Sequence, residues 1–207
     1  MENGRSVYEV CAVCRQPEGW GTPDGDYPQI AGQNGSVTIK RLAGIRARNR
    51  DNPTMNPFTL LECSTAQQIA DVSAYVGCFP MNPNNGVGAG DELAHGEKLY
   101  VEYCAECHGD HGEGSAEMHM PLIQGQHYLY LVRQFDWIRG GKRRNADPEM
   151  VAQIQSFTLR DVAAIMDYMS RLRPPPERVG APDYRNPDFP NFRRPQIAAL
   201  NSRSGQE

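Results

Sequence analysis

The sequence contains no apolar run long enough to cross a bilayer, since such a helix needs about 20 consecutive, mostly apolar residues. It also lacks a charged start followed by an apolar segment, so no signal peptide is visible, and we expect either a cytosolic chain or the mature form of an exported one. The formal net charge is only −4 over 207 residues, which argues against a nucleic-acid binder with its usual basic surplus. No alternating apolar run is long enough to predict a β-sheet.

Histidine is absent from residues 1–94, although the chain has five histidines. This absence coincides with the difference between two similar pentapeptides, CAVCR at residues 11–15 and CAECH at residues 104–108. A spacing of 93 residues joins further identical pairs: Cys11 and Cys104, Cys14 and Cys107, Gln33 and Gln126, and Tyr75 and Tyr168. Met55 and Met150 correspond with a difference of two residues, after which the register returns. The chain is therefore a tandem duplication.

Both copies show helical patterns. A short apolar helix leads into each cysteine pair, and a second helix is predicted over residues 39–46 and 129–139. The last helix of each copy has apolar residues at helical spacing: Ile69, Val72 and Val76, then Val162, Ile165, Met166 and Met169. Capping boxes at Thr65-x-x-Gln68 and Thr158-x-x-Asp161 mark where these last helices begin. The sequence therefore predicts an all-α fold.

Two segments lie outside the repeat. The linker PMNPNNGVGAGDE between the copies is rich in residues that break helices and strands. After about residue 173 the chain becomes proline-rich, with seven of its sixteen prolines. We expect this tail to be extended and without a core of its own.

The CAECH motif has the Cys-x-x-Cys-His pattern that attaches a c-type haem. Two thiols one helical turn apart can each bond a vinyl group of one porphyrin, and the adjacent His108 can ligate the iron from below. A zinc site would need further paired Cys or His residues nearby, and a redox dithiol would not need the histidine. We therefore expect haem c bound through Cys104 and Cys107, with His108 as an axial ligand.

Met150 is the expected second axial ligand, because it lies 42 residues beyond His108, after an intervening helix. The other candidates are less suitable: His111, Met118, His119 and Met120 are too close in sequence to cross the ring, His127 opens a helix, and Met166 and Met169 belong to a core stripe. A structural Met150 that only fills a core gap is the alternative. A His/Met-ligated iron has no open position for substrate and suits one-electron transfer.

Residues 3–172 resemble the two-haem class I cytochromes c of the cytochrome c4 type. The motifs that carry the resemblance are CAECHG, GEG, P-x-I-x-GQ, GKR-N before Met150, and the final DVAAIMDYM helix. The resemblance implies two small all-helical haem domains that shuttle electrons in the periplasm to terminal oxidases or reductases. It also implies that the carbonyl of Pro121 accepts a hydrogen bond from the ring of His108. The expected organisation is a degenerate cytochrome c domain (1–80), a linker (81–91), a haem domain (92–173) and the tail (174–207).

The first copy departs from this family at Arg15, whose guanidinium has no lone pair for iron. Three readings stay open. Haem is absent and the copy is a scaffold, with Trp20 helping to fill the vacated space; or haem is bound through Cys11 and Cys14, with Met55 on one side and a site open to small ligands on the other. In the third reading, Cys11 and Cys14 join Cys63 or Cys78 in a metal or disulfide cluster, while Cys63 and Cys78 are too far apart to bond each other.

We expect an electron-transfer protein rather than a catalyst, with redox proteins as partners: donor and acceptor cytochromes, an oxidase or a reductase. Residues 171–207 hold seven arginines against four acidic residues, so the body of the chain is acidic and can be steered by charge towards a partner. The tail could instead make the chain a stable subunit of a redox complex, with Tyr184, Phe189 and Phe192 as anchors in a partner's grooves. The alternatives are a redox enzyme subunit that uses an open first haem, and an assembly module.

Overall fold

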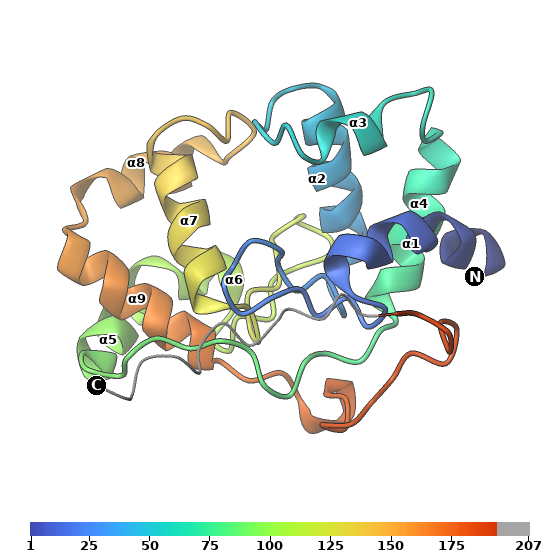
Figure 1. Cartoon of the computed structure of the whole chain (residues 1–207). Helices are drawn as coiled ribbons and strands as arrows, with labels where there is room; N and C mark the ends of the chain where they lie inside the picture. Colours follow the sequence, from blue (N-terminus) through green and yellow to red (C-terminus); the bar gives the residue numbers. More distant parts are fainter. Residues whose placement is uncertain (194–207) are drawn as a thin grey trace, which may run out of the picture.

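The computed structural model describes residues 1–193, which fold into two helical halves joined by an irregular linker (Figure 1). The helices of the first half are α1 (Glu2–Arg15), α2 (Gly35–Arg46), α3 (Asn56–Thr59) and α4 (Ala66–Gly77). Those of the second half are α5 (Leu93–Tyr103), α6 (Ala105–His108), α7 (Tyr128–Arg139), α8 (Pro148–Gln153), η1 (Ile154–Ser156) and α9 (Leu159–Arg171). The described residues contain three isolated bridges and no named strand. The predicted all-α fold is confirmed.

Each half has its own hydrophobic core, in which the first and last helices pack together. In the first half the buried core residues are Tyr8, Ala12, Ala31, Val72, Tyr75, Val76 and Phe79. In the second half they include Tyr100, Leu131, Phe135, Val162, Ile165, Met166 and Met169. A glycine allows each crossing, because a Cβ on Gly4 would collide with Asp71 and Tyr75, and one on Gly96 with Ala164.

The last helix of each half begins at a capping box, as predicted. The Thr65 side chain accepts a hydrogen bond from the backbone of Gln68, and the Gln68 side chain accepts one from the backbone of Thr65. Thr158 and Asp161 form the same reciprocal pair at α9. Such caps satisfy backbone N–H groups that the first helical turn leaves without partners, so these two helix starts are fixed by local sequence.

A reciprocal pair of glutamines joins the two halves. The Gln33 amide donates to the carbonyl of Leu122 (2.9 Å) and accepts from its N–H (3.1 Å). The Gln126 amide does the same to Gln29, at 2.9 Å and 3.0 Å. Gln126 is the repeat equivalent of Gln33, and Leu122 is the equivalent of Gln29. The two contacts are therefore related by a pseudo-twofold axis between the halves.

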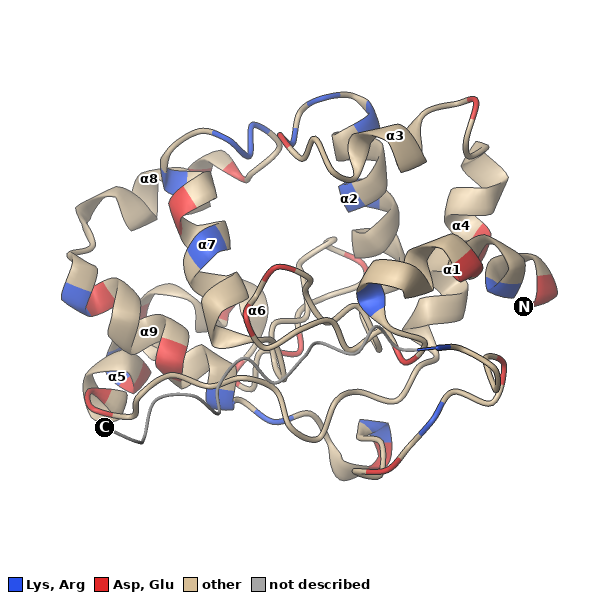
Figure 2. Cartoon of the chain, in the orientation of Figure 1, with Lys and Arg blue, Asp and Glu red and all other residues tan. Residues whose placement is uncertain are grey.

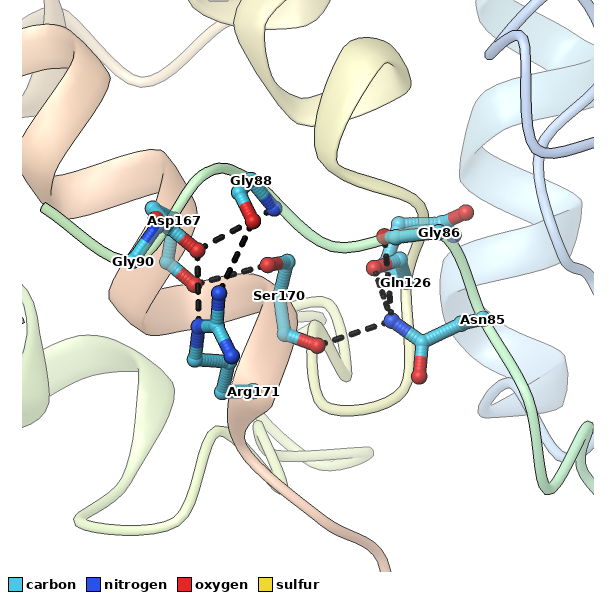
Figure 3. A network of polar contacts seen from close by, with 8 residues as sticks. All are labelled: Asn85, Gly86, Gly88, Gly90, Gln126, Asp167, Ser170 and Arg171. Carbon is cyan, nitrogen blue, oxygen red and sulfur yellow. Dashed lines mark hydrogen bonds and ion pairs between the residues drawn. The ribbon is translucent and has the colours of Figure 1, made fainter.

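The linker has no helix or strand, yet it is held firmly against the second half (Figure 3). The carboxylate of Asp167 in α9 accepts hydrogen bonds from the backbone N–H groups of Gly88 (3.1 Å) and Gly90 (2.5 Å). Arg171 pairs with Asp167 at 2.8 Å and donates to the carbonyl of Gly88. Asn85 bonds the carbonyls of Gln126 and Ser170. Side chains of α9 thus supply hydrogen-bond partners for the linker backbone, and the linker residue Asn85 donates to the backbone of the second half.

The described part of the tail folds back on the first half of the same chain (Figure 1, red). Phe189 packs edge-on against Tyr8 with ring centroids 5.7 Å apart, and Asp188 accepts a 2.5 Å hydrogen bond from Tyr75. Tyr184 lies against Trp20, with ring centroids 6.1 Å apart. Phe192 also packs on the first core.

The three aromatic residues expected to anchor in a partner's grooves therefore contact this chain itself, because the first core leaves apolar surface that they cover. Residues 194–207 of the tail lie outside the described residues. The domain boundaries predicted after residues 80, 91 and 173 stay predictions.

Candidate haem site

The Cys-x-x-Cys-His motif lies where the first helix of the second half is interrupted. α5 ends at Tyr103, Cys104 is a non-helical residue at the break, and the single turn of α6 carries Cys107 and His108. Gly109 ends this turn with φ at 82°, a conformation that glycine adopts without strain. The hydroxyl of Tyr100 donates to the carbonyl of Gly109 and holds the turn to the core. Cys104 is partly buried, Cys107 is exposed, and both thiols are free.

His108 is buried and oriented for ligation. Its side chain is only 8% exposed, and Nδ1 donates to the carbonyl of Pro121 at 3.1 Å. No described residue hydrogen-bonds the other ring nitrogen, Nε2. Burial lowers the pKa of His108, Arg41 and Arg143 lower it further, and the Pro121 carbonyl opposes them. The imidazole is therefore neutral near pH 7, with one nitrogen held and the other available to a metal.

Met150 lies in the first turn of α8. Pro148 opens this helix, and the Asp147 side chain caps it by accepting hydrogen bonds from the backbone of Glu149 and Met150. Met150 is partly buried and packs on the second core, as do Cys104 and Ala105 of the haem-attachment turn. The cap was not recognised in the sequence, although an Asp-Pro pair is a usual helix start.

The other candidate ligands are unsuitable in the structure. His127 is completely buried, and both ring nitrogens are occupied: Nδ1 accepts from the backbone of Gly86 (3.0 Å) and Nε2 donates to the carbonyl of Trp20 (2.7 Å). Met166 and Met169 are core residues at 4% and 7% exposure, and Met118 is 65% exposed. Met150 as the second axial ligand stays a prediction.

The residues around Cys104 and His108 fit a haem c. Two free thiols lie one helical turn apart, a neutral imidazole nitrogen has no partner among residues 1–193, and a partly buried thioether packs on the same core. The donor set of a histidine nitrogen and a methionine sulfur suits haem iron. Within residues 1–193, no group of three or more His, Cys, Asp or Glu could hold another metal ion.

The first half has the same helix and cysteines but no ligand at the histidine position. α1 runs unbroken to Arg15, and the guanidinium of Arg15 lies 5.6 Å from the ring centre of Tyr27. The Arg15 Nη1 atom is buried without a partner among the described residues, and burial lowers the pKa of this side chain. Cys11 and Cys14 are both partly buried free thiols, so the attachment atoms persist without an axial nitrogen.

Two further expectations concern Trp20 and the remaining cysteines of the first half. Trp20 packs on the first core, as Cys11 does, while its indole N–H donates to the carbonyl of Pro80 (2.8 Å) and its ring lies near Tyr184. Its role in filling a vacated haem space stays a prediction. Cys63 and Cys78 are exposed and free, so the structure joins neither of them to Cys11 or Cys14.

Sequence reasoning missed a group of arginines between the halves. Arg50 is 5% exposed, and its Nη2 donates to the hydroxyl of Tyr130 (3.0 Å) and to the side chain of Gln134 (2.7 Å). Arg143 also donates to Gln134 and pairs with Arg50 through an isolated antiparallel bridge. Arg50 and Arg143 are 93 residues apart, so the repeat contained the signal.

Comparisons with known proteins agree with this geometry. Residues 91–169, which contain the CAECH turn and Met150, match the family described as cytochrome c oxidase, cbb3-type, subunit III. The chain is 28% identical to cytochrome c4 of Azotobacter vinelandii and 29% identical to that of Pseudomonas aeruginosa, each alignment covering 82% of this chain and 87% of the relative.

Two solved structures share the fold. Reduced cytochrome c4 from Pseudomonas stutzeri superimposes with a TM-score of 0.73 at 24% identity, over 83% of this chain and 98% of that one. Thiosulfate dehydrogenase (TsdBA) from Marichromatium purpuratum gives a TM-score of 0.70 at 28% identity, over 82% of this chain and 39% of that one.

Proposed function

We propose that this chain, a cytochrome c4-like class I cytochrome, is a periplasmic electron-transfer protein that passes single electrons through one haem c held by its second half. The family match, the relatives and the fold support haem c as the cofactor. The proposed attachment residues are Cys104 and Cys107, and the proposed axial ligands are His108 and Met150. When bound, the haem supplies an iron that exchanges one electron without exchanging ligands.

The observation that carries this proposal is the hydrogen bond from His108 Nδ1 to the carbonyl of Pro121. This bond fixes the tautomer, so that Nε2 has a free lone pair, and it fixes the direction in which that lone pair points. Burial keeps the pKa of His108 low, and protonation therefore does not compete with iron near neutral pH. Pro121 acts only through its backbone, as a positioning group.

The proposed His/Met ligation favours a carrier over a catalyst. A thioether is a soft ligand that stabilises ferrous iron and raises the reduction potential. If His108 and Met150 both held the iron, no ligand position would remain for a substrate. The chain on its own is therefore proposed to transfer electrons and not to catalyse a reaction.

The first half is proposed to be a scaffold without haem. Arg15 has no lone pair to offer iron, and the described first half contains no histidine. The same half supplies Gln33, Gln29 and the carbonyl of Trp20 to hydrogen bonds with the second half. Its proposed role is to stabilise the haem-bearing half and to shield one of its faces from solvent.

Redox proteins are the proposed partners, namely donor and acceptor cytochromes, an oxidase or a reductase. The family match to an oxidase subunit and the structural similarity to thiosulfate dehydrogenase support partners of this kind. Within residues 1–193, no helix is long and apolar enough to span a bilayer. Contact with a membrane-bound oxidase would then be made by protein docking, steered by the acidic body of the chain.

Haem content and attachment test the proposal. A pyridine haemochrome assay should give one haem per chain, and acid acetone should leave the colour on the polypeptide. His108→Ala should lose the native haem spectrum, whereas His111→Ala, a nearby exposed histidine, should keep it. Extraction of the pigment by acid acetone would overturn covalent attachment, and two haems per chain would overturn the scaffold role of the first half.

A further inference from the structure

Positive charge gathers where the two halves face each other. Lys and Arg mark both the loop after α2 and the loop after α7, which approach each other at the top of the view (Figure 2). The loops touch through the backbone: Asp51 N–H donates to the carbonyl of Lys142 (3.0 Å), and Asn145 N–H to that of Asn49 (3.1 Å). Two equivalent arginines, Arg50 and Arg143, therefore meet at the pseudo-twofold axis.

Four arginines form what we call the arginine cluster: Arg15, Arg41, Arg50 and Arg143. Each lies within electrostatic range of the buried Tyr130. Repulsion from Arg50 and Arg41 adds to burial in lowering the pKa of Arg143 to about 9. Among residues 1–193, no carboxylate lies within ion-pair distance of any of the four.

Several hydrogen-bond donors of this cluster are buried without a partner among the described residues. They are Arg15 Nη1, Arg50 Nε, Arg143 Nε and the Nε2 of Gln134, whose side chain is 6% exposed. A buried cation without a counter-charge is strongly unfavourable, and so is an unpaired buried donor. Tyr130 can supply at most one negative charge, which leaves most of the cluster uncompensated.

We propose that the arginine cluster is a binding site for an oxyanion, supplied either by the carboxylates of the chain's own haem c or by an inorganic oxyanion from solution. Guanidinium groups bind carboxylate, phosphate and sulfate oxygens through paired N–H donors. The site takes donors from both halves, since Arg15, Arg41 and Arg50 come from the first and Arg143 and Gln134 from the second. The first source depends on the proposed function, and the second does not.

The location of the cluster supports the haem as one source. Gln134 lies on α7, and other residues of that helix belong to the core on which Cys104 and Met150 pack, so the cluster borders the proposed haem site. Arg41 belongs to the half that lacks an axial histidine. That half would then contribute charge to the haem of the other half.

Two variants and one control test the site. Arg50→Gln changes the least exposed of the four arginines, and Arg41→Gln introduces the residue that the second half has at the equivalent position, Gln134. Arg144→Gln is the matched control, because Arg144 is exposed, adjacent to Arg143, and bonds only the carbonyl of Arg48. Circular dichroism and haem per chain are measured on every sample.

The first arm measures the haem reduction potential of the full chain in chloride buffer. If haem carboxylates occupy the site, both cluster variants should lower the ratio of reduced to oxidised haem about tenfold at fixed ambient potential, which corresponds to about 59 mV. Losing a nearby positive charge favours the ferric state, and Arg144→Gln should shift the potential much less because it is solvated.

The second arm measures the thermal midpoint in 0–10 mM sulfate against chloride of equal ionic strength. If the oxyanion comes from solution, sulfate should raise the midpoint saturably in the wild type and in Arg144→Gln, but not in the cluster variants. The proposal is overturned if sulfate has no saturable effect and the cluster variants have the potential of Arg144→Gln.

Two further outcomes are distinguishable. If Arg50→Gln fails to fold, Arg41→Gln decides, since no described residue hydrogen-bonds Arg41. If the chain carries no haem at all, the proposed function fails, while the sulfate arm still decides the oxyanion site.

Discussion

Replacing Gln33 by alanine should weaken the contact between the two halves by an amount that the structure allows us to work out. The Gln33 side chain is 3% exposed and makes three hydrogen bonds: two with the backbone of Leu122, and one accepted from the backbone N–H of Asn34. Its loss would leave a buried N–H and a buried C=O without partners, and each unsatisfied group costs about 1–3 kcal/mol. We therefore expect Gln33→Ala to lower the free energy of unfolding by about 2–6 kcal/mol.

Gln126→Ala should have a similar effect, because Gln126 makes the equivalent two bonds to Gln29. The assay is urea unfolding followed by circular dichroism on haem-loaded protein. Gln67→Ala is the control, since Gln67 is exposed and bonds only Asp71 on the same helix, so it should cost less than about 0.5 kcal/mol. A loss below about 1 kcal/mol for Gln33→Ala would refute the reasoning that the N–H and C=O of Leu122 are buried and find no other hydrogen-bond partner.

Four further predictions concern the haem, the arginine cluster and the tail. Arg15→His restores the attachment motif of the first half and should raise the haem count from one to two per chain; an unchanged count would mean that Arg15 is not what prevents attachment. Met150→Ala should abolish the far-red charge-transfer absorption of ferric haem, and survival of that absorption would identify another ligand. Burial raises the pKa of Tyr130, but Arg50, Arg41 and Arg143 outweigh it and lower the pKa to about 7. An unfolded tyrosine titrates near pH 10, so stability should rise with pH between these values by up to about 1.4 kcal/mol per unit. Urea unfolding at pH 7, 8 and 9 should show this slope in the wild type and not in Tyr130→Phe; equal slopes would contradict it. Phe189→Ala should lower the free energy of unfolding by about 1–2 kcal/mol, because the partly buried ring no longer packs on Tyr8. No measurable loss would show that the tail does not dock on the first half.

The sequence predicted the features that local residues determine. The capping boxes at Thr65 and Thr158 depend on residues three positions apart, and the haem-attachment turn depends on five consecutive residues. The repeat also predicted two similar halves. Pro121 as the partner of His108 followed from family resemblance, and the structure places the two groups 3.1 Å apart.

The features that were missed depend on contacts between distant parts of the chain. Arg50 meets Arg143 only because two loops face each other across the pseudo-twofold axis. The composition of the tail predicted an extended segment, but only the apolar surface of the first core determines where Phe189 lies. The helix start at Asp147 is different, because it is a local signal that was overlooked.

The glutamine pairing has a consequence for how far the copies can diverge. Gln33 and Gln126 hydrogen-bond the backbone N–H and C=O groups of residues 122 and 29, and not their side chains. Every amino acid except proline has both of these backbone groups. Those two positions already differ, as Gln29 and Leu122, without breaking the symmetry of the contact. A contact made through backbone groups tolerates amino-acid substitutions at positions 29 and 122. The two halves can therefore differ at the position of Arg15 and His108 while this contact between them is kept.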